Sequence, residues 1–148
     1  MTLLINSILY GISTALKEQF GDTYEIQIEE NDQELNKPYF FIACASSGAE
    51  LFPGKRYFRE NRFRIQYVPV TQNQYSECNE VAERMIWCLE YITAAKDTIR
   101  GIKMKYEIID KVLNFYVNYD GFVYKAEEST PMEVLESGTK KEGAVIGS

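Results

Sequence analysis

The segment that most constrains the fold is Tyr39-Phe40-Phe41-Ile42-Ala43-Cys44-Ala45, which follows Pro38 and contains no charged residue. Successive side chains of a strand point to opposite faces, so a run that is apolar at every position is typical of a strand covered on both sides. Turn residues follow it up to Pro53-Gly54. We therefore predict that this run forms the middle strand of a sheet.

Two further segments have apolar residues at spacings of three and four, the pattern of an amphipathic helix. The first covers residues 4–20 and is followed by Gly21, a plausible C-terminal cap. The second covers residues 74–95 and is preceded by Asn73, a suitable N-cap. We predict two helices, each with one face packed on the sheet.

Alternation of apolar and polar residues predicts the remaining strands, at residues 24–28, 56–70, 102–108 and 113–119. Within the second of these, Phe63, Ile65 and Tyr67 should face inward and Arg62, Arg64 and Gln66 outward, and Pro69 suits a strand end or a sheet edge. The Asp110-Lys111 gap predicts a β-hairpin, and Asp120-Gly121 a bulge after which the strand continues to Tyr124.

These elements predict an α+β domain whose sheet has four to five strands, is largely antiparallel with mixed pairing left open, and is packed by two helices. The domain should span residues 1–125. Residues 126–148 contain no aromatic residue and five acids against two lysines, so they can bury little surface. We expect this acidic C-terminal tail to be disordered when the protein is alone.

Composition argues against several kinds of chemistry. The 148 residues include no histidine, which removes the commonest general base and metal ligand, and the net charge of −6 disfavours non-specific binding to nucleic acid. Cys44, Cys78 and Cys88 lack CxxC spacing and suit reduced thiols. The carboxylate pairs Glu29-Glu30, Asp32-Glu34 and Glu127-Glu128 are typical of solvated loops. We expect no catalytic residue, cofactor or metal, and no secretory signal or membrane span.

The densest charge is a basic stripe, defined as Lys55, Arg56, Arg59, Arg62 and Arg64. One interpretation is a subunit interface, where arginine is favoured and the acidic remainder of a second copy offers partners. A second is a solvated edge strand whose charges prevent unwanted pairing. A third is a nucleic-acid surface, with arginines on phosphates and aromatic residues between them stacking on bases.

A second candidate surface lies on the predicted second helix. At 100° per residue, Trp87 and Tyr91 fall opposite the apolar arc, one turn apart and beside Arg84. Large aromatic residues on a polar face need a partner. The sequence leaves two candidates for that partner, another part of this chain and a neighbouring subunit.

Several segments, in this order and spacing, resemble the phage tail terminator proteins found in tailed phages and prophages, largely of Gram-positive hosts. The segments are Phe20-Gly21 after the first helix, Lys37-Pro38-Tyr39-Phe40-Phe41-Ile42, Arg56-Tyr57-Phe58-Arg59, Phe63-Arg64-Ile65-Gln66-Tyr67, Glu77-Cys78-Asn79-Glu80-Val81-Ala82-Glu83-Arg84, Met104-Lys105-Tyr106-Glu107-Ile108 and Phe115-Tyr116-Val117-Asn118-Tyr119. The resemblance covers residues 1–125. Asp110-Lys111 departs from the Asp-Gly expected at that turn.

The resemblance implies a structural virion protein that assembles as a hexameric ring on the last layer of a finished tail tube. There it would stop tube growth and present a surface to the head-tail connector protein, with DNA only passing through the ring as cargo. Assembly in the host bacterial cytoplasm and a place at the head-proximal end of the tail follow from the same resemblance. Two alternatives stay open, a head-tail connector component on the portal side and a nucleic-acid-binding module.

Overall fold

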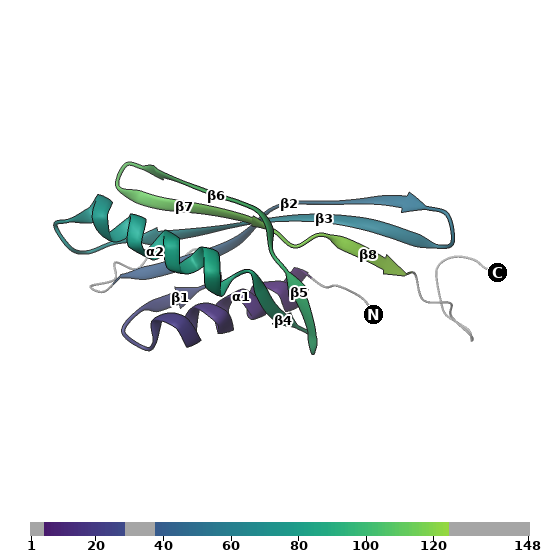
Figure 1. The fold of residues 1–148 in the computed structure, drawn as a ribbon, viewed down its shortest axis with the longest axis horizontal. Coiled ribbons are helices and arrows are strands. Elements are labelled where there is room, and N and C mark those ends of the chain that lie inside the picture. The colour runs from purple at the N-terminus through teal and green to yellow at the C-terminus, as the bar shows by residue number, and fades with distance from the viewer. Residues whose placement is uncertain (1–4, 29–37, 125–148) are drawn as a thin grey trace.

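The computed structural model describes residues 5–28 and 38–124, which form an elongated α+β molecule (Figure 1). Its elements, in chain order, are α1 (Ile5–Phe20), β1 (Glu25–Gln27), β2 (Tyr39–Phe52), β3 (Arg56–Val68), α2 (Gln74–Cys88), β4 (Tyr91–Ala94), β5 (Asp97–Arg100), β6 (Ile102–Ile109), β7 (Val112–Asn118) and β8 (Gly121–Tyr124). No helix in these ranges has the length and apolar character needed to cross a bilayer. The predicted acidic tail lies outside the described residues.

The main sheet has the order β1-β2-β3-β7-β6. The strand β8 pairs with residues 56–59 of β3, on the same side of β3 as β7, which pairs with residues 62–67. β1 is parallel to β2, and every other pairing in the sheet is antiparallel. The predicted α+β class with a largely antiparallel sheet is therefore confirmed, and the pairing that the sequence left open is mixed. The sheet has six strands rather than five because the last predicted strand is interrupted between Asn118 and Gly121.

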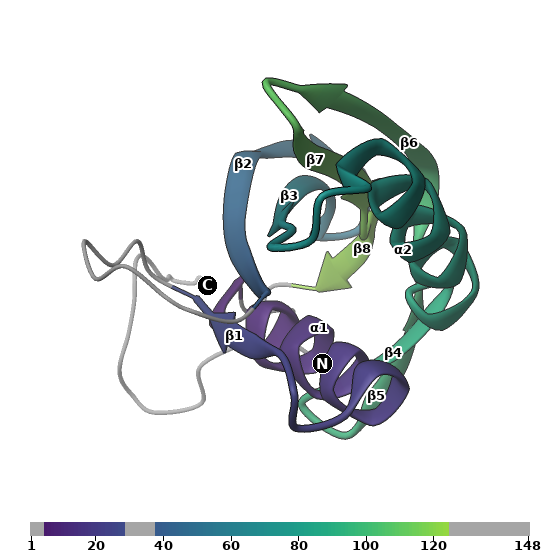
Figure 2. The ribbon, with the colours of Figure 1, turned by 90° about the vertical axis from the view of Figure 1, so that its left-hand side faces the viewer.

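The central strand is β3, not the apolar run at the start of β2. β3 pairs with β2 on one side and with β7 and then β8 on the other, whereas β2 is paired to β1 only at Tyr39–Phe41. A central strand can alternate polar and apolar residues here because both helices lie on the same side of the sheet (Figure 2). The edge-strand interpretation of the basic stripe is therefore wrong.

The core lies between this side of the sheet and the helices. Its fully buried side chains come from α1, α2, β2, β3 and β7 and include Ile8, Ile12, Leu16, Phe40, Ile42, Phe63, Ile65, Tyr67, Met85 and Phe115. Phe20, Tyr24, Phe40 and Tyr67 form an aromatic cluster with ring centroids 4.9–6.0 Å apart. The predicted inward set of β3 is confirmed.

The first helix ends as its sequence predicts. Gly21 has φ +83°, a conformation that a residue without Cβ adopts easily, and its N–H donates to the Lys17 carbonyl at 2.9 Å. Gly11, in the middle of α1, serves another purpose. A Cβ there would lie 2.5 Å from the Thr93 carbonyl oxygen, so glycine lets β4 approach the helix directly.

The second helix is shorter than predicted and ends at Cys88 instead of Ala95. The chain then forms the β4-β5 hairpin, which includes a buried Ile92 and Ala94 and packs against α1. Ile92 lies three residues after Leu89, so it fits the helical spacing as well as the strand alternation. This ambiguity explains why the helix prediction ran seven residues too far.

The predicted β6-β7 hairpin is confirmed. Asp110 and Lys111 both have positive φ, +51° and +65°, as the two central residues of a type I′ turn require. The turn therefore keeps this geometry without the glycine expected at its second position.

Beyond the helices, three strands continue as an extension that we call the arm: residues 46–52 of β2, residues 56–60 of β3, and β8. Figure 1 shows it projecting away from α1, α2 and β1, which belong with β4–β7 and the rest of β2 and β3 to the body. A register shift between Cys44 and Ser46 on β2 marks the boundary. There Ala45 is an extra residue opposite β3, and such bulges bend and twist a strand.

Candidate assembly surfaces

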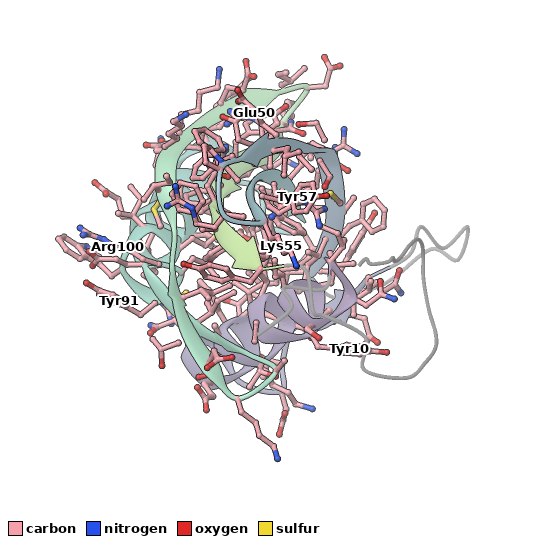
Figure 3. All side chains as sticks on the ribbon, turned by 90° about the vertical axis from the view of Figure 1, so that its right-hand side faces the viewer. Tyr10, Glu50, Lys55, Tyr57, Tyr91 and Arg100 are labelled. Carbon is pink, nitrogen blue, oxygen red and sulfur yellow. The ribbon has the colours of Figure 1, made fainter. Side chains whose placement is uncertain are left out.

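The structure divides the basic stripe among three places. Lys55 lies in the turn between β2 and β3, at the tip of the arm (Figure 3). Because side chains alternate along β3, Arg56, Arg62 and Arg64 lie on the face away from the helices, and Arg59 lies on the other face. We call the face away from the helices the open face of the sheet.

On the open face, neutral groups orient the arginines. Arg62 Nη1 donates to Asn118 Oδ1 at 2.8 Å, and its guanidinium lies 4.8 Å from the ring centroid of Tyr116. Lys105 Nζ lies 5.7 Å from the same centroid. Arg64 Nε is buried without a hydrogen-bond partner among the described residues. The contacts at Arg62 use no carboxylate, so they position its charge without neutralising it.

In the arm, the open face carries an aromatic cluster formed by Phe52, Phe58 and Phe122. The centroid of Phe122 lies 5.4 Å from that of Phe52 and 5.1 Å from that of Phe58, with edge-to-face geometry in both pairs. Arg56 packs its guanidinium 5.0 Å from the Phe122 centroid, and its Nε donates to the Pro53 carbonyl at 3.1 Å. Phe122 is still 47% exposed. The cluster therefore offers apolar surface beside a cation.

Arg59, on the other face, belongs to the joint between arm and body. Its Nη2 donates to Ser47 Oγ at 2.8 Å and its Nε to the Gly48 carbonyl at 3.1 Å. Ser47 Oγ in turn donates to Oδ1 of the buried Asn61 at 2.8 Å. These bonds give Arg59 a structural role in addition to its charge.

Asn61 connects the sheet where the last strand is interrupted. Its N–H donates to Asp120 Oδ1 at 2.8 Å, its Nδ2 to the Tyr119 carbonyl at 3.0 Å, and its own carbonyl accepts from the Tyr119 N–H at 2.9 Å. The Asp120 carboxylate thus takes the place of a backbone acceptor. We call Asn61, Ser47, Tyr119 and Asp120 the junction. Asp120-Gly121 suggested a bulge here, but nothing in the sequence indicated that Asn61 would be buried.

The second candidate surface is also divided. Arg84 donates to the Gln19 carbonyl at 3.0 Å and packs 4.3 Å from the Phe20 centroid, so it joins α2 to the end of α1 within this chain. Trp87 is 76% exposed at the end of α2. Tyr91 is not on the helix but on β4, where it is 57% exposed and lies 5.8 Å from the Arg100 guanidinium (Figure 3). The aromatic residues stay exposed, whereas the arginine is partly buried and makes its contacts within this chain.

The three cysteine thiols and the buried phenol of Tyr119 are poorly suited to nucleophilic or acid-base chemistry. Cys44, Cys78 and Cys88 are free, and burial raises the pKa of each thiol, that of Cys88 to about 11. A protonated thiol is a weak nucleophile. Burial also raises the pKa of Tyr119, whose hydroxyl donates to the Leu89 carbonyl at 2.7 Å. The carboxylate pairs at 29–34 and 127–128 lie outside the described residues.

A comparison with protein families finds a match to the family described as phage tail terminator protein, over residues 7–131. No curated protein matches. Among solved structures, one similar chain is the sheath/tube terminator of PVC, an extracellular contractile injection system, in the extended state determined by cryo-EM. The TM-score is 0.52 at 13% identity, and the match covers 97% of this chain and 66% of that chain.

The family match extends from α1 through β8, so it includes both the body and the arm. It confirms the resemblance carried by the strand and helix motifs, and the PVC terminator confirms the fold. Family membership supports a structural, tail-terminating role. The chain belongs to the phage tail terminator protein family.

Proposed function

We propose that this protein forms a ring of six copies on the last layer of a finished tail tube, where it stops further growth and presents a surface to the head-tail connector protein. The observation that carries the proposal is the family match over residues 7–131, which extends from the first turn of α1 through β8. The protein would assemble in the host bacterial cytoplasm and remain at the head-proximal end of the virion tail. DNA would only pass through the ring.

The geometry of a ring explains how a small protein can end a polymer. A contact between two different patches of the same chain, repeated by rotation, closes once the last copy meets the first. One side of such a ring matches the end of the tube. If its far side differs from the tube subunit, no further layer can be added, and the new surface is available to another protein.

The described surfaces supply patches of the right character. The open face presents Arg62 and Lys105 around Tyr116, with Arg62 fixed by Asn118. The chain as a whole carries 22 acids against 16 basic residues, so a neighbouring copy offers many carboxylates. Such complementarity favours the correct register more than it raises affinity. Trp87 on α2 and Tyr91 on β4 are further exposed aromatic residues that a tail or connector protein could contact.

A structural, tail-terminating role involves no catalytic step. We infer that the protein acts through binding surfaces alone and that it needs no cofactor. Among the described residues, no group of three or more histidine, cysteine, aspartate or glutamate side chains could hold a metal ion.

Tail length tests the proposal directly. In a phage or prophage that encodes this chain, a strain lacking it should produce overlong tails without heads, as seen by negative-stain electron microscopy. Purified protein added to the growing tubes should restore a single length. Tails of normal length that fail only to join heads would indicate the connector role instead. A salt-dependent shift of DNA on a gel, with normal tails, would indicate the nucleic-acid-binding alternative.

A further inference from the structure

We propose that neighbouring copies pair through their arms: β8 of one copy adds, as a parallel strand, to the edge of β2 at residues 46–52 of the next. This inference rests on the proposed ring and names the contact that would build it. The partner is therefore a second copy of this chain.

The arm has two edges that no other described strand covers. β2 pairs with β1 only at Tyr39–Phe41, so beyond Cys44 its ladder partner among the described residues is β3 alone. β8 likewise pairs with β3 alone. A sheet edge presents unpaired N–H and C=O groups and is a template for another strand. The arm thus carries two such templates, on opposite sides of one three-stranded sheet.

The junction determines which backbone groups point outward. Asn61 directs its N–H and C=O toward Tyr119 and Asp120, so its pair with Ser47 on β2 is not hydrogen-bonded. Hydrogen-bonded and non-hydrogen-bonded pairs alternate along an antiparallel ladder. Ala49 and Leu51 therefore also point their N–H and C=O groups away from β3.

The same alternation applies to β8. The backbone N–H and C=O of Arg59 point to the same side of β3 as those of Asn61, toward β8, because the two residues are two positions apart along the strand. Its partner Gly121 is thus hydrogen-bonded to β3, whereas Phe122 and Tyr124 direct their N–H and C=O groups outward. Each edge of the arm offers an outward-facing set, Ser47, Ala49 and Leu51 on β2 and Phe122 and Tyr124 on β8.

Ring symmetry sets the direction of the new pair. β2 and β8 are both antiparallel to β3, so they run in the same direction along the arm. If the arms lie along the ring axis, rotation keeps them all pointing the same way, and β8 of one copy meets β2 of the next in parallel. The two edges are different, so the contact is head-to-tail and can repeat until the ring closes. Closure then removes every open edge of the arms.

The composition of the edge suits a strand partner. Ser46-Ser47-Gly48-Ala49 has no charge, no proline and no bulky side chain, the devices that usually protect an exposed edge. Leu51 at 65% and Tyr124 at 59% exposure lie next to the two edges. A neighbouring arm would cover both these side chains and the outward-facing backbone.

The test blocks each edge separately. Proline at position 49 removes an outward N–H and leaves the ladder to β3 intact, and proline at position 124 does the same on β8. We expect Ala49→Pro and Tyr124→Pro each to raise the dissociation constant for self-association at least about tenfold, the equivalent of about 1.4 kcal/mol. Ala49→Val and Tyr124→Thr, which keep the N–H, should assemble as the wild type does. Sedimentation and circular dichroism would measure assembly and folding.

Mixing the two proline variants gives the sharpest result. Ala49→Pro keeps its β8 edge and Tyr124→Pro keeps its β2 edge, so an equimolar mixture should form dimers that cannot grow further, while each variant alone stays monomeric. Assembly of Tyr124→Pro with loss in Ala49→Pro would indicate a β2-to-β2 contact and overturn the proposal. Normal assembly of Ala49→Pro with lowered thermal stability would assign the β2 edge to this chain's own residues 126–148, and would also overturn it.

Failure of the inference is distinguishable from failure of the proposed function. Rings that form and restore normal tail length despite both proline substitutions would retain the terminator role and reject arm pairing. A wild-type protein that neither self-associates nor limits tail length would reject the function itself.

Discussion

The body and the arm share strand β3, yet the same strand has two different environments. In the body, Phe63, Ile65 and Tyr67 are fully buried beneath the helices. In the arm, Tyr57 and Phe58 are only partly buried, and no described helix lies over them (Figure 1). One region is therefore stabilised by its own core, whereas the other keeps exposed apolar surface and two strand edges that no other described strand pairs.

The largest expected effect tests whether stability is concentrated in the body. Phe63→Ala should lower the free energy of unfolding of the monomer by about 3–5 kcal/mol, because it removes a fully buried ring. Phe58→Ala, on the same strand, should cost only about 1 kcal/mol, because it removes an edge-to-face contact with Phe122 at a partly exposed site. Urea denaturation measures both. Equal losses would mean that the arm belongs to the same core.

The junction should have the next largest effect. Asn61→Ala leaves the Tyr119 carbonyl without its side-chain donor and removes the acceptor of Ser47 Oγ, so we expect a loss of about 1–3 kcal/mol in the free energy of unfolding. Ser46→Ala, at an exposed neighbouring position, is the control and should change it by less than about 0.5 kcal/mol. A near-neutral Asn61→Ala would show that arm and body are held together by the β3 backbone alone.

Alkaline pH tests the burial of the body by another route. Burial raises the pKa of Cys88 from its ordinary 9.0 to about 11, so the native thiol keeps its proton where the unfolded thiol loses it. Stability should therefore fall as pH rises from about 9 to about 11, and Cys88→Ala should make that decline shallower. Chemical denaturation at pH 8 and pH 10.5 compares the two proteins. Parallel declines would show that Cys88 is not protected in the folded state.

The smallest effect on folding is expected at Trp87. The side chain is 76% exposed, so Trp87→Ala should change the free energy of unfolding by less than about 0.5 kcal/mol. If Trp87 contacts a tail or connector protein, purified tubes or connectors should retain less of the Trp87→Ala variant than of the wild-type protein in a pull-down. If tubes and connectors both retain the variant as well as the wild-type protein, Trp87 is not one of the proposed contacts.

Much of the body could be predicted from the sequence because its strands and helices bury alternating or helically spaced apolar residues. The inward set on β3, the cap at Gly21 and the hairpin at Asp110-Lys111 all follow from local patterns. The end of α2 could not be predicted, since Ile92 suits both a helix and a strand. Contacts with residues elsewhere in the chain distinguish the two, among them the approach of Thr93 to Gly11 and the pairing of Ile92 with Ile99 on β5.

The candidate site was less predictable. A charge cluster in the sequence does not say which face each side chain occupies, and the turn at Lys55 and the alternation of β3 separate five neighbouring cations. Asn61 could not be identified as a buried junction residue because its partners Tyr119 and Asp120 are 58 and 59 residues away in the chain. The arm itself depends on which strands extend past the helices, and that is a property of the fold.

Hydrogen exchange of the wild-type protein, measured before and after assembly, tests the central claim most directly. If arms pair edge to edge, new protection should appear in peptides covering residues 46–52 and 121–124, while the core segments of α1, β7 and α2 keep the protection they already have. Unchanged exchange in the arm, with new protection confined to the body, would contradict the account.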